Sequence, residues 1–284
     1  MKRNIYLKTI PPAEAVARVK ASIDREALIR EETIPSHEAS GRVLAHAVHA
    51  RYSSPTFHSA AMDGYAVNAR STFAAREGHP LTLKAGETCF AVNTGHPMPE
   101  GCDAVIMIEQ VVLDGGGVTI EAPAFPWQHV RRIGEDIVAT ELLFPRNHQL
   151  RPWDVGALLS GGIWDVPVWE RVTVRIIPTG DEVLDFTTHP DPGKGQVVES
   201  NSQMLAALAR ELGCVVERAA PVPDNPEALH QALKDSLDAG RHLTIFCAGS
   251  SAGSKDFTRA TLEKEGEILT HGIAAMPGKP SLLA

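Results

Sequence analysis

The sequence has few aromatic residues and no long apolar run, and these shortages exclude several classes of protein. Phe, Trp and Tyr make up only 5% of the 284 residues, and no stretch approaches the roughly 20 consecutive apolar residues of a membrane-spanning helix. Residues 1–16 carry basic side chains but lack the apolar segment of a secretory signal peptide. We therefore expect a cytoplasmic protein with no membrane partner.

Cysteine is also scarce, and its spacing does not indicate a metal site. The four cysteines lie far apart and form no Cys-x-x-Cys pair. A zinc site or a disulfide framework normally shows such regular spacing. We expect four reduced thiols, at Cys89, Cys102, Cys214 and Cys247.

Basic residues are too few and too scattered to form a nucleic-acid-binding surface. The chain has 27 Lys and Arg against 35 Asp and Glu, a net charge of −8. We expect no nucleic-acid partner, so any phosphate must be bound by a local arrangement of residues. With 43% hydrophobic and 22% charged residues, the composition is typical of a folded globular chain and excludes a disordered one.

Periodicity divides the chain into three predicted regions. Residues 12–30 carry apolar side chains at helical spacing behind a Pro-Pro start, which predicts one amphipathic helix. Residues 52–144 contain short β-prone runs broken by Gly and Pro, with a hairpin signal at residues 114–117. We predict an extended N-terminal domain over residues 1–51 and 144–170, a β-rich domain over 52–143, and an α/β domain over 171–284.

From residue 171 onward, strand and helix patterns alternate. Strands separated by helices run parallel in a sheet covered on both faces, so we predict a doubly wound α/β fold. The predicted order is strand 172–177, helix 201–212, strand 214–222, helix 226–239, strand 242–248, helix 258–265 and strand 267–273. The apolar stripe predicted for the first of these helices consists of Met204, Leu205, Leu208 and Leu212.

Three predicted loops follow strands and therefore emerge at the same carboxyl edge of the sheet, where ligands bind in this fold class. The loops are residues 178–183, 221–226 and 248–256. The third is rich in Gly and Ser and suits an anion, and clustered carboxylates suit a divalent cation that bridges to phosphate. Taken singly, each acid also fits a helix cap or a turn. The acids at this edge are Asp181, Glu182, Asp224 and Asp256.

The Gly/Ser loop approaches two other motifs. Its glycines, Gly249 and Gly253, are separated by three residues, whereas a Walker phosphate loop needs four. The stretch does satisfy Gly-x-Ser-x-Gly, which leaves open a serine hydrolase with Ser251 as nucleophile, Asp256 as orienting acid and His271 as base. Against this alternative, further residues intervene before the predicted helix, and the three candidates crowd into a short stretch of chain.

Five ordered motifs extend over nearly the whole chain. They are Ser-Ala-Ala-Met-Asp-Gly-Tyr-Ala (59–66), Asn-Thr-Gly-His-Pro-Met-Pro-Glu-Gly (93–101), Arg-Arg-Ile-Gly-Glu-Asp-Ile (131–137), Pro-Thr-Gly-Asp-Glu-Val (178–183) and Pro-Gly-Lys-Pro (277–280). Together and in this order they resemble the motifs of MoeA-type molybdenum insertases, the family that includes the E domain of gephyrin. One such motif is weak evidence, but five in order are specific.

The resemblance implies both a fold and a reaction. The fold is an elongated homodimer with an extended N-terminal domain, a β domain, and an α/β domain like that of the MogA/MoaB adenylyltransferases. The reaction is insertion of molybdate into the dithiolene of adenylylated molybdopterin, with Mg²⁺ and release of AMP. The family's cleft combines the β domain of one subunit with the α/β domain of the other. A molybdopterin adenylyltransferase and apo-molybdoenzymes are the implied partners.

The resemblance also implies roles for individual residues. Carboxylates hold a pyrophosphate-linked nucleotide only through a cation, because both carry negative charge, and a lysine in a rigid turn suits molybdate. The implied catalytic residues are Asp63, Asp136, Glu182, Asp256 and Lys279. Substrate-binding residues would be Thr94, Thr179, Gly180, Gly249, Ser250, Ser251, Gly253, Pro277 and Gly278. The Mg²⁺ ligands would be Asp181, Glu182, Asp224 and Asp256.

The chain departs from the family pattern at three places. Ala248 replaces a loop glycine, and Met276 replaces the first lysine of a Lys-Pro-Gly-Lys-Pro motif. The sequence stops at Ala284, before the family's Pro-Gly-Asn-Pro segment and its C-terminal β-barrel domain, so we expect an incomplete α/β domain. These departures favour an alternative function, a non-catalytic molybdopterin-binding carrier of the same fold.

Overall fold

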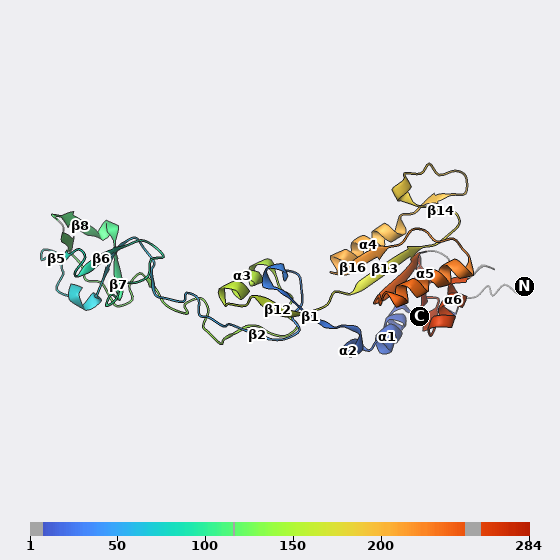
Figure 1. The fold of residues 1–284 in the computed structure, drawn as a ribbon, viewed down its shortest axis with the longest axis horizontal. Helices are drawn as coiled ribbons and strands as arrows, with labels where there is room; N and C mark the ends of the chain where they lie inside the picture. Colours follow the sequence, from blue (N-terminus) through green and yellow to red (C-terminus); the bar gives the residue numbers. More distant parts are fainter. Residues whose placement is uncertain (1–7, 116, 248–256) are drawn as a thin grey trace, which may run out of the picture. The chain divides into compact units, whose positions relative to one another are not determined.

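A computed structural model describes residues 8–115, 117–247 and 257–284. Its internal contacts divide the chain into two compact units. Residues 32–168 form one, here called the β unit, and the residues up to Glu31 together with Trp169–Ala284 form the other, here called the α/β unit (Figure 1). The predicted division into three domains stays a prediction.

The α/β unit is built on a three-stranded parallel sheet. Its order is β16 (Val215–Arg218), β13 (Thr173–Pro178) and β17 (Leu243–Cys247), with β13 hydrogen-bonded to both neighbours. The helices that alternate with these strands are α4 (Asn201–Glu211), α5 (Pro226–Asp238) and α6 (Phe257–Glu265). The predicted alternation and the parallel strands are confirmed for these elements.

The last predicted strand does not join this sheet. Only β18 (Thr270–His271) forms there, and it pairs antiparallel with β19 (Leu282–Leu283). The prediction of a fourth parallel strand over residues 267–273 was wrong, because the chain turns back at residues 276–280 and closes a hairpin instead. The motif Pro-Gly-Lys-Pro forms the tip of that hairpin.

The helices of this unit follow their local signals, with one difference in the buried face. Asn225 caps α5 by accepting a hydrogen bond from the Ala228 amide at 2.8 Å, as its sequence position predicts. In α4, however, Ala206 is buried and Leu205 partly buried, whereas three of the four predicted stripe residues point outward. These are Met204, Leu208 and Leu212, which are 64%, 52% and 75% exposed. The prediction placed the large apolar residues of α4 in the core. The residue of α4 that is buried there is the small Ala206, with Leu205 and Ala209 packed against the same core.

A further difference concerns the N-terminal helix predicted over residues 12–30. The structure has two helices, α1 (Pro12–Ser22) and α2 (Arg25–Leu28). Ile23 takes an extended conformation that ends α1, and the Asp24 carboxylate accepts a hydrogen bond from the Ala27 amide at 3.3 Å to begin α2. The capping signal at Asp24 therefore determines where the second helix begins, although the apolar periodicity predicts one continuous helix.

The β unit contains two antiparallel three-stranded sheets. One has the order β6 (Cys89–Val92), β4 (Gly64–Val67) and β7 (Ala104–Met107), and the other β5 (Leu81–Lys84), β9 (Gly117–Ile120) and β8 (Val111–Asp114). Strands β8 and β9 form the hairpin predicted from the glycines at residues 115–117. Residues of both sheets share one core, which includes Val67, Leu83, Cys89, Ile106, Val118 and Ile120.

The rest of the β unit consists of short ladders around two further cores of the described residues. One includes Ala60, Val92, Val105 and Val130, and the other includes Leu44, Leu150, Leu158, Val166 and Val168. The remaining elements are β1 (Glu31–Pro35), β2 (Val48–His49), β3 (Ser59–Ala60), β10 (Val130–Arg131), β11 (Leu142–Phe144), α3 (Pro152–Ser160) and β12 (Asp165–Trp169), with β14 (Val183–Leu184) and β15 (Val197–Val198) in the α/β unit. Single 3₁₀ turns occur at Ser36–Glu38, Ala69–Thr72, Ile108–Gln110 and Phe186–Thr188. Across the described parts of the chain, no helix combines the length and apolarity that crossing a membrane requires.

Gly64 is required by close contact between two strands. A Cβ atom there would lie 2.0 Å from the Ile106 carbonyl oxygen in β7. Replacement by Ala therefore forces β4 and β7 apart at one end of their ladder, where Gly64 pairs with Met107.

We predict that Gly64→Ala lowers the free energy of unfolding by about 3 kcal/mol, because overpacking acts on backbone that cannot yield. Urea denaturation measures the loss. Gly41→Ala is the control: Gly41 has a φ of +80°, but no described atom beyond its two chain neighbours lies within 4 Å of its Cβ position. It should cost about 1 to 2 kcal/mol, the strain of a left-handed alanine. Equal losses in the two variants would contradict the steric explanation.

Asp154 is a buried charge in the first turn of α3. Burial raises its pKa, but hydrogen bonds from Arg151 and from His148, whose Nε2 lies 2.8 Å from Oδ2, outweigh burial and lower the pKa from 3.8 to about 2. A depressed pKa contributes stability that is fully present above pH 4 and is lost as the pH falls through 2.

We predict that the wild-type chain loses about 2 kcal/mol more unfolding free energy between pH 4 and pH 2 than Asp154→Asn does, since 1 pKa unit is worth about 1.4 kcal/mol. Urea titrations at several pH values provide the measurement. Asp165→Asn, an exposed acid of the same unit, should follow the wild type. If Asp154→Asn does so too, Asp154 is not the group responsible.

Candidate functional site

Three of the sequence motifs meet in the β unit. The Asp63 carboxylate accepts hydrogen bonds from the Thr94 amide at 2.7 Å and from the Thr94 hydroxyl at 3.1 Å. Backbone bonds from Gly95 to the Ala60 carbonyl and from Ala61 to the His129 carbonyl join the same segments, both at 2.8 Å. Asp63 and Thr94, predicted from separate motifs, therefore lie in contact.

Asp136 also lies beside these segments, but in an ion pair. Arg131, at the end of β10, pairs with Ser59 of β3 and places Nη2 2.7 Å from both carboxylate oxygens of Asp136. The hydrogen bond and the charge of Asp136, followed by the charge of Glu135, raise the pKa of Arg131. The predicted catalytic carboxylate is therefore neutralised by a neighbour from its own motif.

A strained loop adjoins this cluster and was not predicted. Trp127 and His129 have φ values of +67° and +52°, which bulky side chains seldom adopt. The Trp127 ring lies 4.8 Å from the His58 ring, and His58 Nδ1 accepts a hydrogen bond from the Ile133 amide. Strain of this kind gathers at functional sites. No local sequence signal identifies it, because a bulky residue such as Trp seldom adopts left-handed backbone and a single His is a weak signal for it.

In the α/β unit, two of the predicted loops lie side by side at the carboxyl edge. The Thr179 amide donates to the Cys247 carbonyl at 2.9 Å, and the Gly180 amide donates to the Val222 carbonyl at 3.1 Å. One step further, the Asp181 carboxylate accepts a hydrogen bond from the Asp224 amide at 3.1 Å. The parallel sheet thus brings two of the predicted metal-binding acids together.

Glu182 points back over the same turn. A Cβ atom on Gly180, whose φ is +137°, would lie 3.0 Å from Glu182 Oε2. The Glu182 side chain is exposed. Gly180 therefore leaves the space that the Glu182 carboxylate occupies, which explains a glycine in this motif.

The described residues supply oxygen donors for Mg²⁺ but not a complete cage. No three His, Cys, Asp or Glu side chains within the described ranges are grouped to hold a metal ion. Mg²⁺ usually takes only one or two carboxylates and completes its shell with water and substrate phosphates. Asp181, Glu182 and Asp224 therefore fit such an ion. Five further predicted residues, Gly249, Ser250, Ser251, Gly253 and Asp256, lie outside the described residues.

Lys279 lies at the tip of the β18–β19 hairpin. Its carbonyl accepts a hydrogen bond from the Ile273 amide at 2.9 Å, and its side chain is exposed. Gly278 has a φ of +106°, which the turn requires of a glycine. Met276, which replaces the family's first lysine, is 88% exposed. Pro277 and Gly278 shape the tip that presents Lys279 to solvent.

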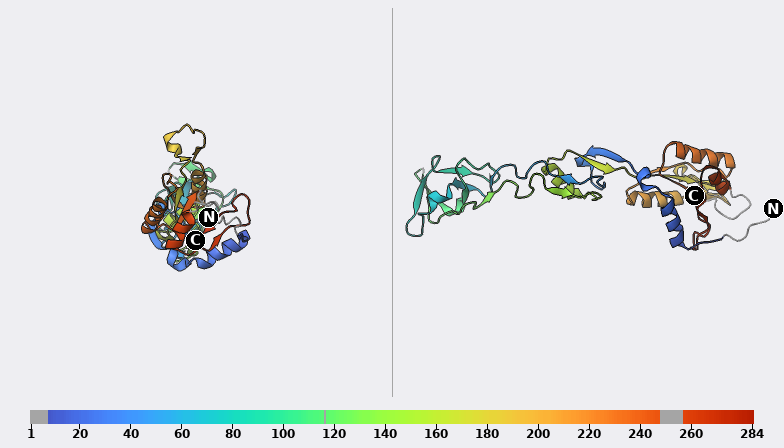
Figure 2. Two further views of the ribbon diagram at one scale, coloured as in Figure 1. Left: turned by 90° about the vertical axis from the view of Figure 1, so that its right-hand side faces the viewer. Right: turned by 90° about the horizontal axis from the view of Figure 1, so that it is seen from below.

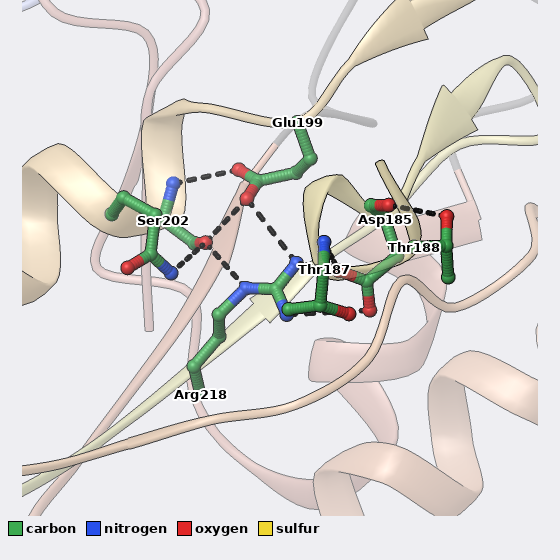
Figure 3. A network of polar contacts seen from close by, with 7 residues as sticks. Asp185, Thr187, Thr188, Glu199, Ser202 and Arg218 are labelled. Carbon is green, nitrogen blue, oxygen red and sulfur yellow. Dashed lines mark hydrogen bonds and ion pairs between the residues drawn. The ribbon is translucent and has the colours of Figure 1, made fainter. Parts of the chain in front are cut away.

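A buried network of charged side chains lies at the same edge and was not predicted from the sequence (Figure 3). Arg218, the last residue of β16, donates from Nε to the Ser202 hydroxyl at 2.9 Å and from Nη2 to Asp185 at 3.1 Å, and its Nη2 lies 3.5 Å from Glu199. Glu199 also affects Cys247 at the end of β17. Burial, and then the negative charge of Glu199, raise the pKa of the Cys247 thiol to about 11. Asp185, Glu199 and Arg218 lie in ordinary turn and strand contexts, so spacing alone does not reveal them.

Comparison with known proteins identifies both regions. Residues 10–162 match the family described as "MoeA N-terminal region (domain I and II)", and residues 175–284 match "Probable molybdopterin binding domain". Two crystal structures of MoeA from Pyrococcus horikoshii are 28% identical and superpose with TM-scores of 0.78 and 0.75. They match 97% and 98% of this chain, which covers 71% and 72% of theirs.

Curated relatives carry the same assignment. A molybdopterin molybdenumtransferase of Synechococcus elongatus is 31% identical over 89% of this chain, and one of Haemophilus influenzae is 33% identical over 88%. The chain spans about two thirds of their length, 67% and 64%.

These matches define the class as proteins of molybdenum cofactor biosynthesis, whose curated relatives here are transferases. Within that class, the chain belongs to the MoeA family. The resemblance inferred from the five motifs is confirmed.

Proposed function

We propose that this chain catalyses insertion of molybdate into adenylylated molybdopterin, with release of AMP, in the cytoplasm. The observation that carries the proposal is the contact of Asp181 with the Asp224 backbone, beside Glu182, at the carboxyl edge of a parallel sheet. In this fold class that edge binds ligands, and the matched family region is named for molybdopterin binding.

Each group has a role that follows from its chemistry. Asp181, Glu182 and Asp224 are the residues that would hold Mg²⁺. When bound, Mg²⁺ supplies positive charge against the pyrophosphate. Lys279 offers an exposed ammonium to the molybdate oxyanion. In the β unit, Asp63 orients the Thr94 hydroxyl, whose oxygen lone pairs remain free to accept a hydrogen bond from substrate.

The proposal extends to the assembly. In the family that this chain resembles, residues such as Asp63 and Thr94 act with the α/β unit of a second subunit, so we propose a homodimer. An adenylyltransferase would supply the substrate, and an apo-molybdoenzyme would accept the product.

The direct test is to incubate the purified chain with molybdopterin-AMP, molybdate and Mg²⁺, and to follow AMP release and recovery of an apo-molybdoenzyme. Absence of both would refute the proposal.

Met276 favours a second candidate, a carrier that binds molybdopterin without inserting the metal. An oxyanion needs cationic or N–H partners when water is partly excluded, and this position offers a thioether instead. The carrier would bind molybdopterin-AMP but would not release AMP on addition of molybdate.

We predict that chelation of Mg²⁺ weakens molybdopterin-AMP binding at least tenfold, and that Glu182→Ala and Asp224→Ala reproduce much of this loss, because carboxylates repel the pyrophosphate unless a cation lies between them. Isothermal titration calorimetry measures the affinity. Asp238→Ala, an exposed acid at the far end of α5, serves as the control. If a chelator leaves the molybdopterin-AMP affinity unchanged, Mg²⁺ has no role in binding this substrate.

A second prediction separates enzyme from carrier. Met276→Lys should strengthen molybdate binding by about 1 kcal/mol, roughly fivefold, because it adds a charge near Lys279 that solvent partly screens. Molybdate-dependent AMP release should rise in this variant and should disappear in Lys279→Ala. Met276→Gln controls for polarity without charge. If Met276→Lys leaves both molybdate affinity and AMP release at background while molybdopterin-AMP still binds, the chain is a carrier.

A further inference from the structure

Arg218 joins three segments that are separate in the sequence. Its guanidinium lies 3.1 and 3.4 Å from the two Asp185 oxygens, after β14. It lies 3.5 Å from Glu199, after β15, and 2.9 Å from the hydroxyl of Ser202 in the first turn of α4. Figure 3 shows the guanidinium at the centre of these groups.

The surroundings hold the guanidinium in one orientation. The side chains of Arg218, Asp185 and Glu199 are only 14%, 20% and 4% exposed. The Phe186 ring covers one face of the guanidinium at 4.6 Å. Glu199 also accepts hydrogen bonds from the Ser202 amide and hydroxyl. A planar donor with a fixed fork fits this arrangement, whereas an ammonium of the same charge reaches fewer of the partners.

The segment held by Arg218 carries Glu182. The Val197 amide donates to the Glu182 carbonyl, and the Glu199 amide donates to the Leu184 carbonyl, both at 3.0 Å. These bonds belong to the β14–β15 ladder. Between the two strands, residues 185–196 extend away from the helices of the unit (yellow in Figure 1 and in the left view of Figure 2). Such an extension needs an anchor at its base, and the acids at its two ends, Asp185 and Glu199, both contact Arg218.

We propose that Arg218 is a positioning residue, which holds the base of this extension and thereby fixes the backbone of Glu182 at the carboxyl edge. Arg218 does not touch the substrate in this proposal, because Asp185, Glu199 and Ser202 already occupy its donors. The inference rests on the proposed function for its catalytic consequence. Its structural part concerns only residues of the α/β unit.

The experiment compares Arg218→Lys and Arg218→Met with Arg241→Lys. Arg241 precedes β17 and forms a more exposed ion pair, with Nη2 2.7 Å from Glu217 of β16. The first readout is hydrogen exchange at the Val197 and Glu199 amides. The second is the Mg²⁺ concentration that gives half-maximal AMP release. Arg218→Lys retains the charge, so it keeps the test valid if Arg218→Met fails to fold.

We expect exchange at both amides to accelerate at least tenfold in Arg218→Lys, and the half-maximal Mg²⁺ concentration to rise about tenfold. Arg241→Lys should change neither, although both variants alter a buried or half-buried arginine. Excess Mg²⁺ should restore much of the rate in Arg218→Lys, which a general loss of folded protein would not allow.

Two results would overturn the inference. Unchanged exchange at Val197 and Glu199 in Arg218→Lys would show that Arg218 does not hold the ladder. Faster exchange with an unchanged Mg²⁺ requirement would show that the ladder does not position Glu182. If the wild-type chain releases no AMP, the proposed function fails, and the inference is then decided by exchange alone.

Discussion

The hydrogen bonding of β13 to both β16 and β17 is the constraint on which the α/β unit depends. Because all three strands run parallel, the chain leaves each of them at the same edge. Backbone bonds then join the segment at Thr179 and Gly180 to Val222 and to the end of β17, which places Asp181 and Asp224 at this edge. The acidic edge is therefore a consequence of strand direction, before any side chain contributes.

Electrostatics sets a second condition at this edge. Several described carboxylates follow β13, β14, β15 and β16, and they repel one another unless cations intervene. Arg218 neutralises the buried pair, and hydrogen bonds from Thr187 and Arg218 lower the pKa of Asp185. Removal of one partner from such a cluster leaves a buried charge uncompensated, which typically costs about 3 to 5 kcal/mol. The exposed acids Asp181 and Glu182 have no comparable constraint and remain available to a ligand.

The β unit reaches its arrangement by different means. Here short ladders and single backbone bonds, rather than one sheet, join residues 58–64, 93–98 and 129–136. Gly64 permits the close approach of β4 to β7, and the left-handed backbone at Trp127 and His129 turns the chain into β10. The Asp63–Thr94 contact depends on this convergence, because the two residues lie 31 positions apart.

Local signals in the sequence determined much of the fold. The Asn225 cap, the glycine hairpin between β8 and β9, and the alternation after residue 171 all acted as predicted, since each depends on neighbouring residues. The five motifs likewise identified the family, and the two loops after β13 and β16 meet as strand direction requires. The same local reasoning failed in two places. Packing against the sheet determined which face of α4 is buried, and a chain reversal replaced the fourth parallel strand with a hairpin.

Only the tertiary structure decided which groups touch. Arg218, Asp185 and Glu199 belong to segments up to 33 residues apart, and nothing in their spacing marks them as partners. The contact of Trp127 with His58 is equally invisible in the sequence. The physical reason is that caps, turns and strand direction are set by short-range backbone chemistry. The pairing of distant side chains depends instead on where the completed sheet and loops bring them.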